Sequence, residues 1–166
     1  MRIRMFVCGL LLVAGMAASA AAANGPKPLS GKKFDALATA ALEAMKAKAA
    51  ELKMGGVAVV NFAPGDAIAG WSSKMAVVGR MTDEPTATSK GNNLLGVAYA
   101  KSAEMARTLV NSGTSGGTPM TGEFGWQGGV MERVKGGAII VSFSGGKSED
   151  DVQVSKAGLA VMKSGL

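Results

Sequence analysis

The stretch Lys135–Ser148, with the sequence KGGAIIVSFSGGKS, holds the strongest strand signal in the chain. Its centre, Ala138–Phe143, is rich in β-branched and other apolar residues, which favour a strand. The glycines at 136 and 137 predict a tight hairpin turn to an antiparallel neighbour. Ser148, with Asp151 three residues later, is close to a capping box and predicts the start of a last helix. An antiparallel hairpin that leads into a helix is typical of α+β folds.

Helix and strand signals alternate in the residues before this stretch. Apolar residues recur at helical spacing from Phe34 to Leu52 and from Leu94 to Ser112, and Ser30 is placed to cap the first of these helices. Further strands are expected at residues 57–62, within residues 67–81 and at residues 124–134, with loops at residues 82–93 and 113–122. The order α-β-β-α-β-β-α predicts a single two-layer α+β domain over residues 24–166, an antiparallel β-sheet with helices packed on one face.

The first 23 residues show the three parts of a secretory signal peptide. Arg2 and Arg4 give a positive start, Met5–Met16 is an apolar run, and Ala17–Ala23 is a tract of small residues. The apolar run is shorter than the roughly 20 residues that a membrane-spanning helix needs. Cleavage after residue 20 and cleavage after residue 23 both satisfy the small-residue rule. We therefore expect residues 1–23 to be a signal peptide, the mature protein to be periplasmic or secreted, and no membrane association after cleavage.

Composition excludes several classes of function. The chain has no histidine, which excludes Ser-His-Asp and Cys-His catalysis, HExxH metal sites and proximal-histidine haem ligation. Its single cysteine, Cys8, lies in the signal segment, so neither a disulfide framework nor a cysteine zinc site is expected. Loss of Arg2 and Arg4 lowers the net charge from +6 to +4, and the lysines are dispersed. We therefore expect no nucleic-acid binding, which needs a basic stripe with stacking aromatic residues.

A few residues remain as candidates for binding a ligand. Arg80, near the end of its expected strand, and Lys101, within a helix, are candidate partners for an anion, although a lysine on a helix is commonly just solvated. The pair Gly128-Gly129 inside a strand either lets a ligand or another backbone approach closely or marks a bulge. Tyr99 is the only tyrosine and is either an iron ligand or a buried residue with one hydrogen bond.

Two other patterns have ordinary structural explanations. Residues 144–148, SGGKS, resemble half of a phosphate-binding loop, but Val141 stands where the first glycine of that motif belongs. The acidic residues 149–151 that follow would repel a phosphate. The methionines are dispersed, so core packing is their default role and metal ligation the alternative. We find no pair of carboxylates whose spacing marks an acid/base set, so no catalytic residue is predicted and an enzymatic role is the less favoured one.

Several segments resemble the GlcG/HbpS family, the haem-binding or haem-degrading proteins related to the C-terminal domain of PduO. Phe124–Val130, FGWQGGV, is similar to the family's "GGvP" strand, and Gly137–Gly146 is similar to its "G-aiGvSGg" strand. Ser148–Leu159 is similar to the helix that follows in the family, and Ala98–Ala106 to its "A-rKA-tA" helix. The resemblance implies an α+β fold on an antiparallel sheet, homo-oligomers, and haem, a related tetrapyrrole or a small anion as ligand.

Three hypotheses follow, in order of preference. The first is an exported, non-catalytic binding protein for haem or a related small molecule. Arg80 and Lys101 would then meet its anionic groups, Gly128, Gly129 and Gly145 would line the pocket, and Tyr99 or a methionine would be the axial ligand. The second hypothesis is an accessory subunit of a periplasmic redox or transport complex. The third is an enzyme that acts on a small hydroxy acid or a corrinoid.

Overall fold

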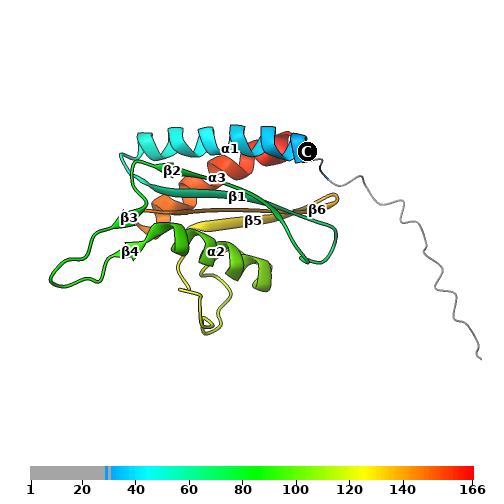
Figure 1. Cartoon of the computed structure of the whole chain (residues 1–166). Helices are drawn as coiled ribbons and strands as arrows, with labels where there is room; N and C mark the ends of the chain where they lie inside the picture. The colour runs from blue at the N-terminus through cyan, green and yellow to red at the C-terminus, as the bar shows by residue number, and fades with distance from the viewer. Residues whose placement is uncertain (1–28, 30) are drawn as a thin grey trace, which may run out of the picture.

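Three helices and a four-stranded antiparallel sheet make up the main body of the protein (Figure 1). The computed structural model describes residue 29 and residues 31–166, so the predicted signal peptide and the predicted cap Ser30 lie outside the described residues. The elements are α1 (Gly31–Glu51), β1 (Gly56–Pro64), β2 (Ser72–Val78), β3 (Thr82–Asp83), β4 (Asn92–Asn93), α2 (Leu94–Thr108), β5 (Gly129–Val134), β6 (Gly137–Ser144) and α3 (Ser148–Ser164). The α+β class and the predicted order of the main elements are therefore confirmed. No helix within residues 31–166 is both long and apolar enough to cross a membrane.

The main sheet has the strand order β2-β1-β6-β5, with every neighbouring pair antiparallel. The two hairpins predicted from the turn residues form its two halves, and they join between β1 and β6. In that central pair Val57 lies opposite Ser144 and Pro64 lies opposite Gly137. The start of β1 and the end of β6 therefore meet at the same end of the sheet, directly before α3 begins.

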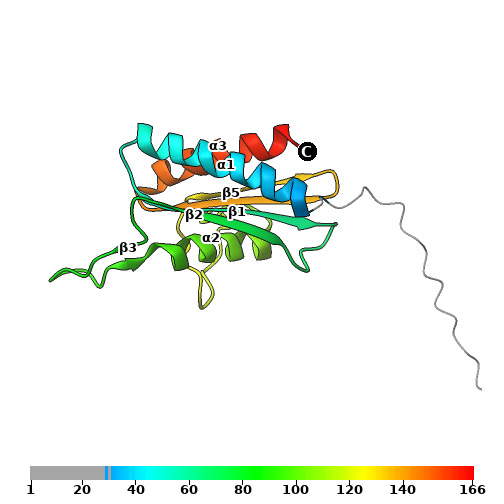
Figure 2. The same ribbon diagram turned by 45° about the horizontal axis from the view of Figure 1, so that its top comes forward.

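The helices cover both faces of the sheet, which differs from the expected two-layer arrangement. Helices α1 and α3 lie side by side on one face, and α2 lies on the other (Figures 1 and 2). The physical reason is that the central strands are apolar on both sides, since all eight residues of β6 are buried. A strand of this kind needs a helix on each face, because each apolar face must be removed from water.

Each face of the sheet has its own core. The larger core lies under α1 and α3, and its strand residues alternate along β1 and β6 as the period of a strand requires. These residues are Ala58, Val60, Phe62, Ile139, Val141 and Phe143. The smaller core lies under α2 and contains Val57, Val59, Leu94 and Ala98. The α2 side is less apolar and depends more on buried polar contacts.

One such contact is a chain of hydrogen bonds that joins α2 to the sheet. The side-chain amide nitrogen of Asn61, Nδ2, donates to Ser102 Oγ at 3.1 Å, and Ser102 Oγ lies 2.9 Å from Ser142 Oγ. Ser142 Oγ in turn donates to the carbonyl of Ala98 at 2.8 Å. Its hydroxyl hydrogen is therefore used, so Ser102 must be the donor in the bond between the two serines. Because all three polar side chains are fully buried, these bonds fix the position of α2 on the sheet.

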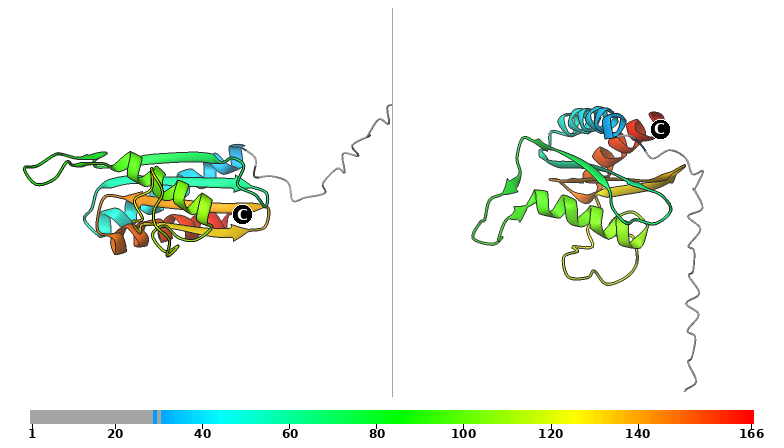
Figure 3. Two further views of the ribbon diagram at one scale, coloured as in Figure 1. Left: turned by 90° about the horizontal axis from the view of Figure 1, so that it is seen from below. Right: turned by 45° about the vertical axis from the view of Figure 1, so that its right-hand side comes forward.

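Some boundaries differ from those expected. The segment 82–93, predicted as a loop, contains the short β3–β4 hairpin, which projects from the body (Figure 3). Helix α2 ends at Thr108 rather than Ser112, because Leu109 takes a left-handed conformation with φ of 59°. Strand β5 begins only at Gly129, although the pattern predicted a strand from Phe124. Ser148 is the first residue of α3 and not its cap, since the N-cap position belongs to Lys147, which makes no side-chain capping bond.

Candidate functional site

A cleft of about 480 Å³ opens at the end of the sheet where β6 leads into α3. Its volume lies within the range of small-molecule sites. The residues that line it come from the β3–β4 hairpin, α2, the segment before β5 and the start of α3. They are Asp83, Asn92, Leu94, Lys101, Trp126, Gln127, Ser144, Gly145, Gly146, Lys147, Ser148, Glu149 and Asp151. Segments that are far apart in the sequence therefore converge on one concave surface.

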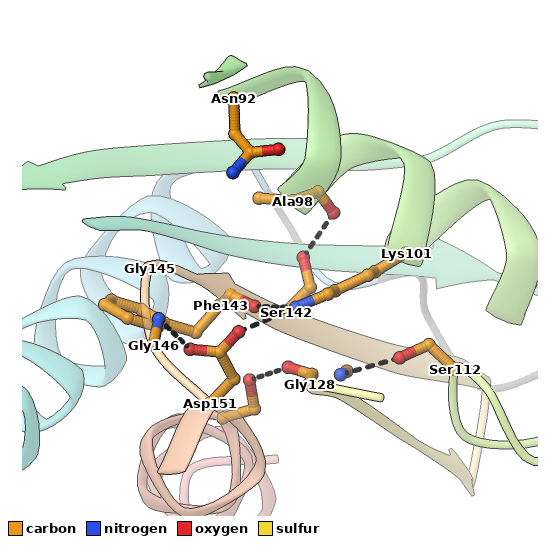
Figure 4. Close-up of polar contacts among 12 residues, drawn as sticks. Asn92, Ala98, Lys101, Ser112, Gly128, Ser142, Phe143, Gly145, Gly146 and Asp151 are labelled. Atoms are coloured by element: carbon orange, nitrogen blue, oxygen red, sulfur yellow. Dashed lines mark hydrogen bonds and ion pairs between the residues drawn. The ribbon is translucent and has the colours of Figure 1, made fainter. Parts of the chain in front are cut away.

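A buried ion pair between Lys101 and Asp151, called the buried pair below, lies at the base of this cleft. Lys101 reaches down from α2 and Asp151 reaches up from the first turn of α3 (Figure 4). The distance from Lys101 Nζ to Asp151 Oδ2 is 2.8 Å, and each residue is only 3% exposed. Nζ also donates to the carbonyl of Phe143 at 2.8 Å. The other carboxylate oxygen of Asp151 accepts the backbone N–H of Gly146 at 2.9 Å.

Burial moves both members of the pair toward their neutral forms. Desolvation lowers the pKa of Lys101, although the charge and the hydrogen bond of Asp151 oppose that change. Desolvation likewise raises the pKa of Asp151, against the opposing effects of Lys101 and of the backbone N–H groups of Gly146 and Gly145. Perturbed groups that share a cleft are a recognised mark of functional sites, although ion pairs of purely structural importance also show them.

Gly128 lets the backbone just before β5 approach the buried pair closely. Its carbonyl accepts Ser155 Oγ at 2.6 Å and the backbone N–H of Phe143 at 3.0 Å. Its φ is 134°, a conformation that residues with a side chain rarely adopt, and a Cβ there would collide with Lys101 Nζ. For the glycine pair, either close approach of a ligand or another backbone or a bulge was expected; at Gly128 the groups that approach closely are the side chains of the buried pair.

Arg80 joins the backbone segments at the edge of the cleft instead of pointing into it. Its guanidinium donates to Asp83 Oδ1 at 2.8 Å, to the carbonyl of Gly55 at 2.9 Å and to that of Gly145 at 2.6 Å. Hydrogen bonds from Asn92 and from Arg80 lower the pKa of Asp83. Arg80 therefore positions Asp83 and Gly145, which both line the cleft.

We expect Arg80→Ala to lower the free energy of unfolding by about 1–2 kcal/mol, because bonds to three acceptors are lost from a partly exposed group. Arg80→Lys should cost nearly as much, since one ammonium group cannot span these three acceptors. Urea unfolding measures both effects. Arg133→Lys, at an exposed position of β5, is the matched control and should change stability by less than about 0.5 kcal/mol. Full retention of stability in Arg80→Lys would contradict this role.

An aromatic side chain that the sequence analysis did not select forms one wall. Trp126 is 46% exposed and lines the cleft, and its ring lies 4.8 Å from that of Phe124 between centroids. A half-exposed tryptophan supported by a second ring offers a flat apolar surface to a ligand. The available signal was the local density of aromatic residues in FGWQGG, directly before the glycine pair.

The structure brings some of the six residues predicted for the site to the cleft and leaves others out. Lys101 and Gly145 line the cleft, while Arg80 and Gly128 contact residues that line it. Gly129, the next residue along the chain, does not line the cleft, and its backbone N–H donates to Ser112 Oγ at 2.8 Å. Tyr99 is not part of the cleft, because it packs on the Val57 and Val59 side of α2 and lies 3.1 Å from Ser73 Oγ.

The residues around the cleft do not fit haem. Haem iron is held by histidine, cysteine, methionine or tyrosine, and none of these is among the lining residues. Leu94 and Trp126 are the only large apolar side chains among them, whereas Asp83, Glu149 and Asp151 are acidic. A separate finding, which does not bear on haem, is that residues 29 and 31–166 hold no group of three or more acidic, histidine or cysteine side chains that could bind a metal ion. Most of the side chains that line this cleft are instead polar or charged.

Comparison of the chain with protein-family models, with curated proteins and with solved structures gave no match.

Proposed function

We propose that this chain is an exported binding protein for a small polar molecule, which occupies the cleft at the start of α3. The observation that carries the proposal is the combination, in one cleft, of the buried Lys101–Asp151 pair and the half-exposed face of Trp126. A buried ion pair costs desolvation energy, and its replacement by apolar residues often leaves a protein as stable or more stable. Stability alone therefore gives little reason for such a pair. Its position at a cleft beside an aromatic wall supports a role in binding.

The charges around the cleft indicate the kind of ligand. Asp83 is paired with Arg80, and Lys101 is paired with Asp151, so most of the charge is already compensated. The amides of Asn92 and Gln127 add neutral donors and acceptors. We therefore favour a ligand with hydroxyl, carbonyl or single carboxylate groups, small enough for about 480 Å³, over a tetrapyrrole.

A titration that follows Trp126 fluorescence tests the proposal. Trp71→Phe leaves Trp126 as the only tryptophan, since the chain has two. We expect a saturable change with one of four probes (glycolate, lactate, glyoxylate or pyruvate) and no saturable change with haemin.

The reverse variant, Trp126→Phe, is the matched control for this titration. It reports from Trp71, which precedes β2 at the opposite end of the sheet, and should not respond to the same probe. A saturable response to haemin alone would contradict the preference for a small ligand. No response to any of the five probes would count against the binding proposal itself.

One observation favours the second hypothesis, an accessory subunit of a periplasmic complex. Exposed apolar side chains gather in the segment between α2 and β5, where exposed patches commonly mark interaction sites. These side chains are Leu109, Val110, Met120, Phe124 and Trp126. A tagged protein should then retain one partner in stoichiometric amount and lose it on Met120→Ser with Phe124→Ser. Sedimentation analysis in the same preparation would show whether the homo-oligomer implied by the family resemblance forms.

A further inference from the structure

The amine of Lys101 combines features that the exposed lysines lack. It lies at the base of a cleft of about 480 Å³, it is 3% exposed, and a carboxylate oxygen lies 2.8 Å away. Lys147 lines the same cleft but is exposed, so water solvates its charge. A buried lysine loses its proton more readily than an exposed one, which is how lysines that attack carbonyl groups are activated.

The contacts of Nζ can be kept by a neutral amine as well as by an ammonium group. Two acceptors surround it, Asp151 Oδ2 and the carbonyl of Phe143, each at 2.8 Å. A neutral amine has two N–H bonds and one lone pair, so both N–H bonds can point to these acceptors while the lone pair points away from them. Gly128 packs against Nζ from one side, so a ligand can reach this nitrogen only from the cleft, which Lys101 lines.

We propose that Lys101 condenses with the carbonyl group of a small aldehyde or ketone bound in the cleft, forming an imine, with Asp151 carrying the proton. This inference rests on the proposed function and specifies its ligand class. The carbonyl oxygen of such a ligand lies within the polar part of the cleft, and its remaining atoms face Trp126.

Atoms and electrons balance without any other reactant. The lone pair of Nζ forms a bond to the carbonyl carbon, and the carbonyl oxygen gains a proton to become a hydroxyl. Asp151 takes a proton from nitrogen and delivers it to that hydroxyl, which leaves as water while the C=N bond forms. The two protons lost by the amine are the two hydrogens of the water released, and addition of water reverses the reaction.

The pKa directions of the pair agree with this geometry. Burial lowers the pKa of Lys101, which increases the neutral fraction of the nucleophile, and raises the pKa of Asp151, which makes its carboxylate a stronger base for the proton that leaves nitrogen.

Reductive trapping of the full chain tests the inference. The protein is incubated with pyruvate and cyanoborohydride, which reduces an imine to a stable secondary amine, and the labelled lysines are mapped by proteolysis and mass spectrometry. We expect Lys101 to carry the reduced pyruvate adduct with a several-fold higher occupancy than Lys147, the matched lysine of the same cleft, because burial increases the neutral fraction of Lys101 and Asp151 lies beside it to carry the proton. Asp151→Asn should slow labelling of Lys101 without changing that of Lys147.

The outcomes separate this inference from the function on which it rests. Label on exposed lysines with none on Lys101, together with a saturable Trp126 titration by pyruvate, would overturn the imine and leave the binding site standing. No label on Lys101 and no saturable titration with any probe would remove both. Mapping of the wild-type chain decides the matter even if Asp151→Asn does not fold.

Discussion

Lys101→Met should lower the free energy of unfolding by about 3–5 kcal/mol near neutral pH, because it leaves the Asp151 carboxylate buried without its partner. Both residues are 3% exposed, so water cannot replace the lost ammonium group. Domains of this size are stable by about 5–15 kcal/mol, so the variant should lose a large part of its stability. Urea unfolding followed by circular dichroism measures the change.

The stability lost in Lys101→Met should decrease as the pH falls, because the Asp151 carboxylate then takes up a proton and loses its charge. Burial already raises its pKa in the folded protein above the ordinary value of 3.8, and Lys101→Met removes the positive charge that opposes this. Between 3.8 and the raised folded value, the folded state binds more protons than the unfolded state, so stability falls as the pH rises through that window. Acidification from neutral pH should therefore bring the variant closer to the wild type.

Two further variants show whether the uncompensated charge is the cause. Lys101→Met with Asp151→Leu removes both charges and should recover most of the lost stability, since an apolar pair of similar volume often replaces a buried ion pair without cost. Lys147→Met, in the same cleft but exposed, should change stability by less than about 0.5 kcal/mol. If the double variant were as unstable as the single one, packing of the lysine stem rather than charge would explain the loss.

The order of the elements was predictable because it depends on local patterns. The β-branched runs Val57–Phe62 and Ala138–Phe143 and the glycines at 136 and 137 each act within a few residues. The side of the sheet that α2 occupies was not predictable in this way. It depends on burial of both faces of β1 and β6, which becomes visible only once the two hairpins are joined in register.

The site was predictable only in part, for a related reason. Lys101 and Gly145 were selected as single residues, but the partner of Lys101 lies 50 positions away on α3. Asp151 was interpreted as a helix-capping residue, and one of its oxygens does bind the backbone N–H of Gly146. Its other oxygen meets Lys101 because β6 carries α3 to the end of the sheet beneath α2, which no spacing along the chain encodes.

Gly128→Ala should destabilise the protein through two separate effects. An alanine at φ of 134° stores backbone strain of about 1–3 kcal/mol. Its Cβ would also lie against Lys101 Nζ and only 2.8 Å from Asp151 Cβ, and overpacking of this kind costs about 1–3 kcal/mol more. Because the atoms that must move belong to the buried pair, we also expect Gly128→Ala to abolish trapping of pyruvate at Lys101. Urea unfolding and mass mapping measure the two consequences.

Three other glycines separate these effects. Gly116 has φ of 71°, and a methyl group added there would have no neighbour within 4 Å, so Gly116→Ala shows the cost of backbone strain alone. Gly117 is equally open and has no such φ, so Gly117→Ala should change little. At Gly129 a methyl group would meet the flexible end of Met105, which can move aside, and Gly129→Ala should cost less than Gly128→Ala. If Gly128→Ala cost no more than Gly116→Ala and still allowed trapping at Lys101, the close approach of Gly128 would have no bearing on the amine.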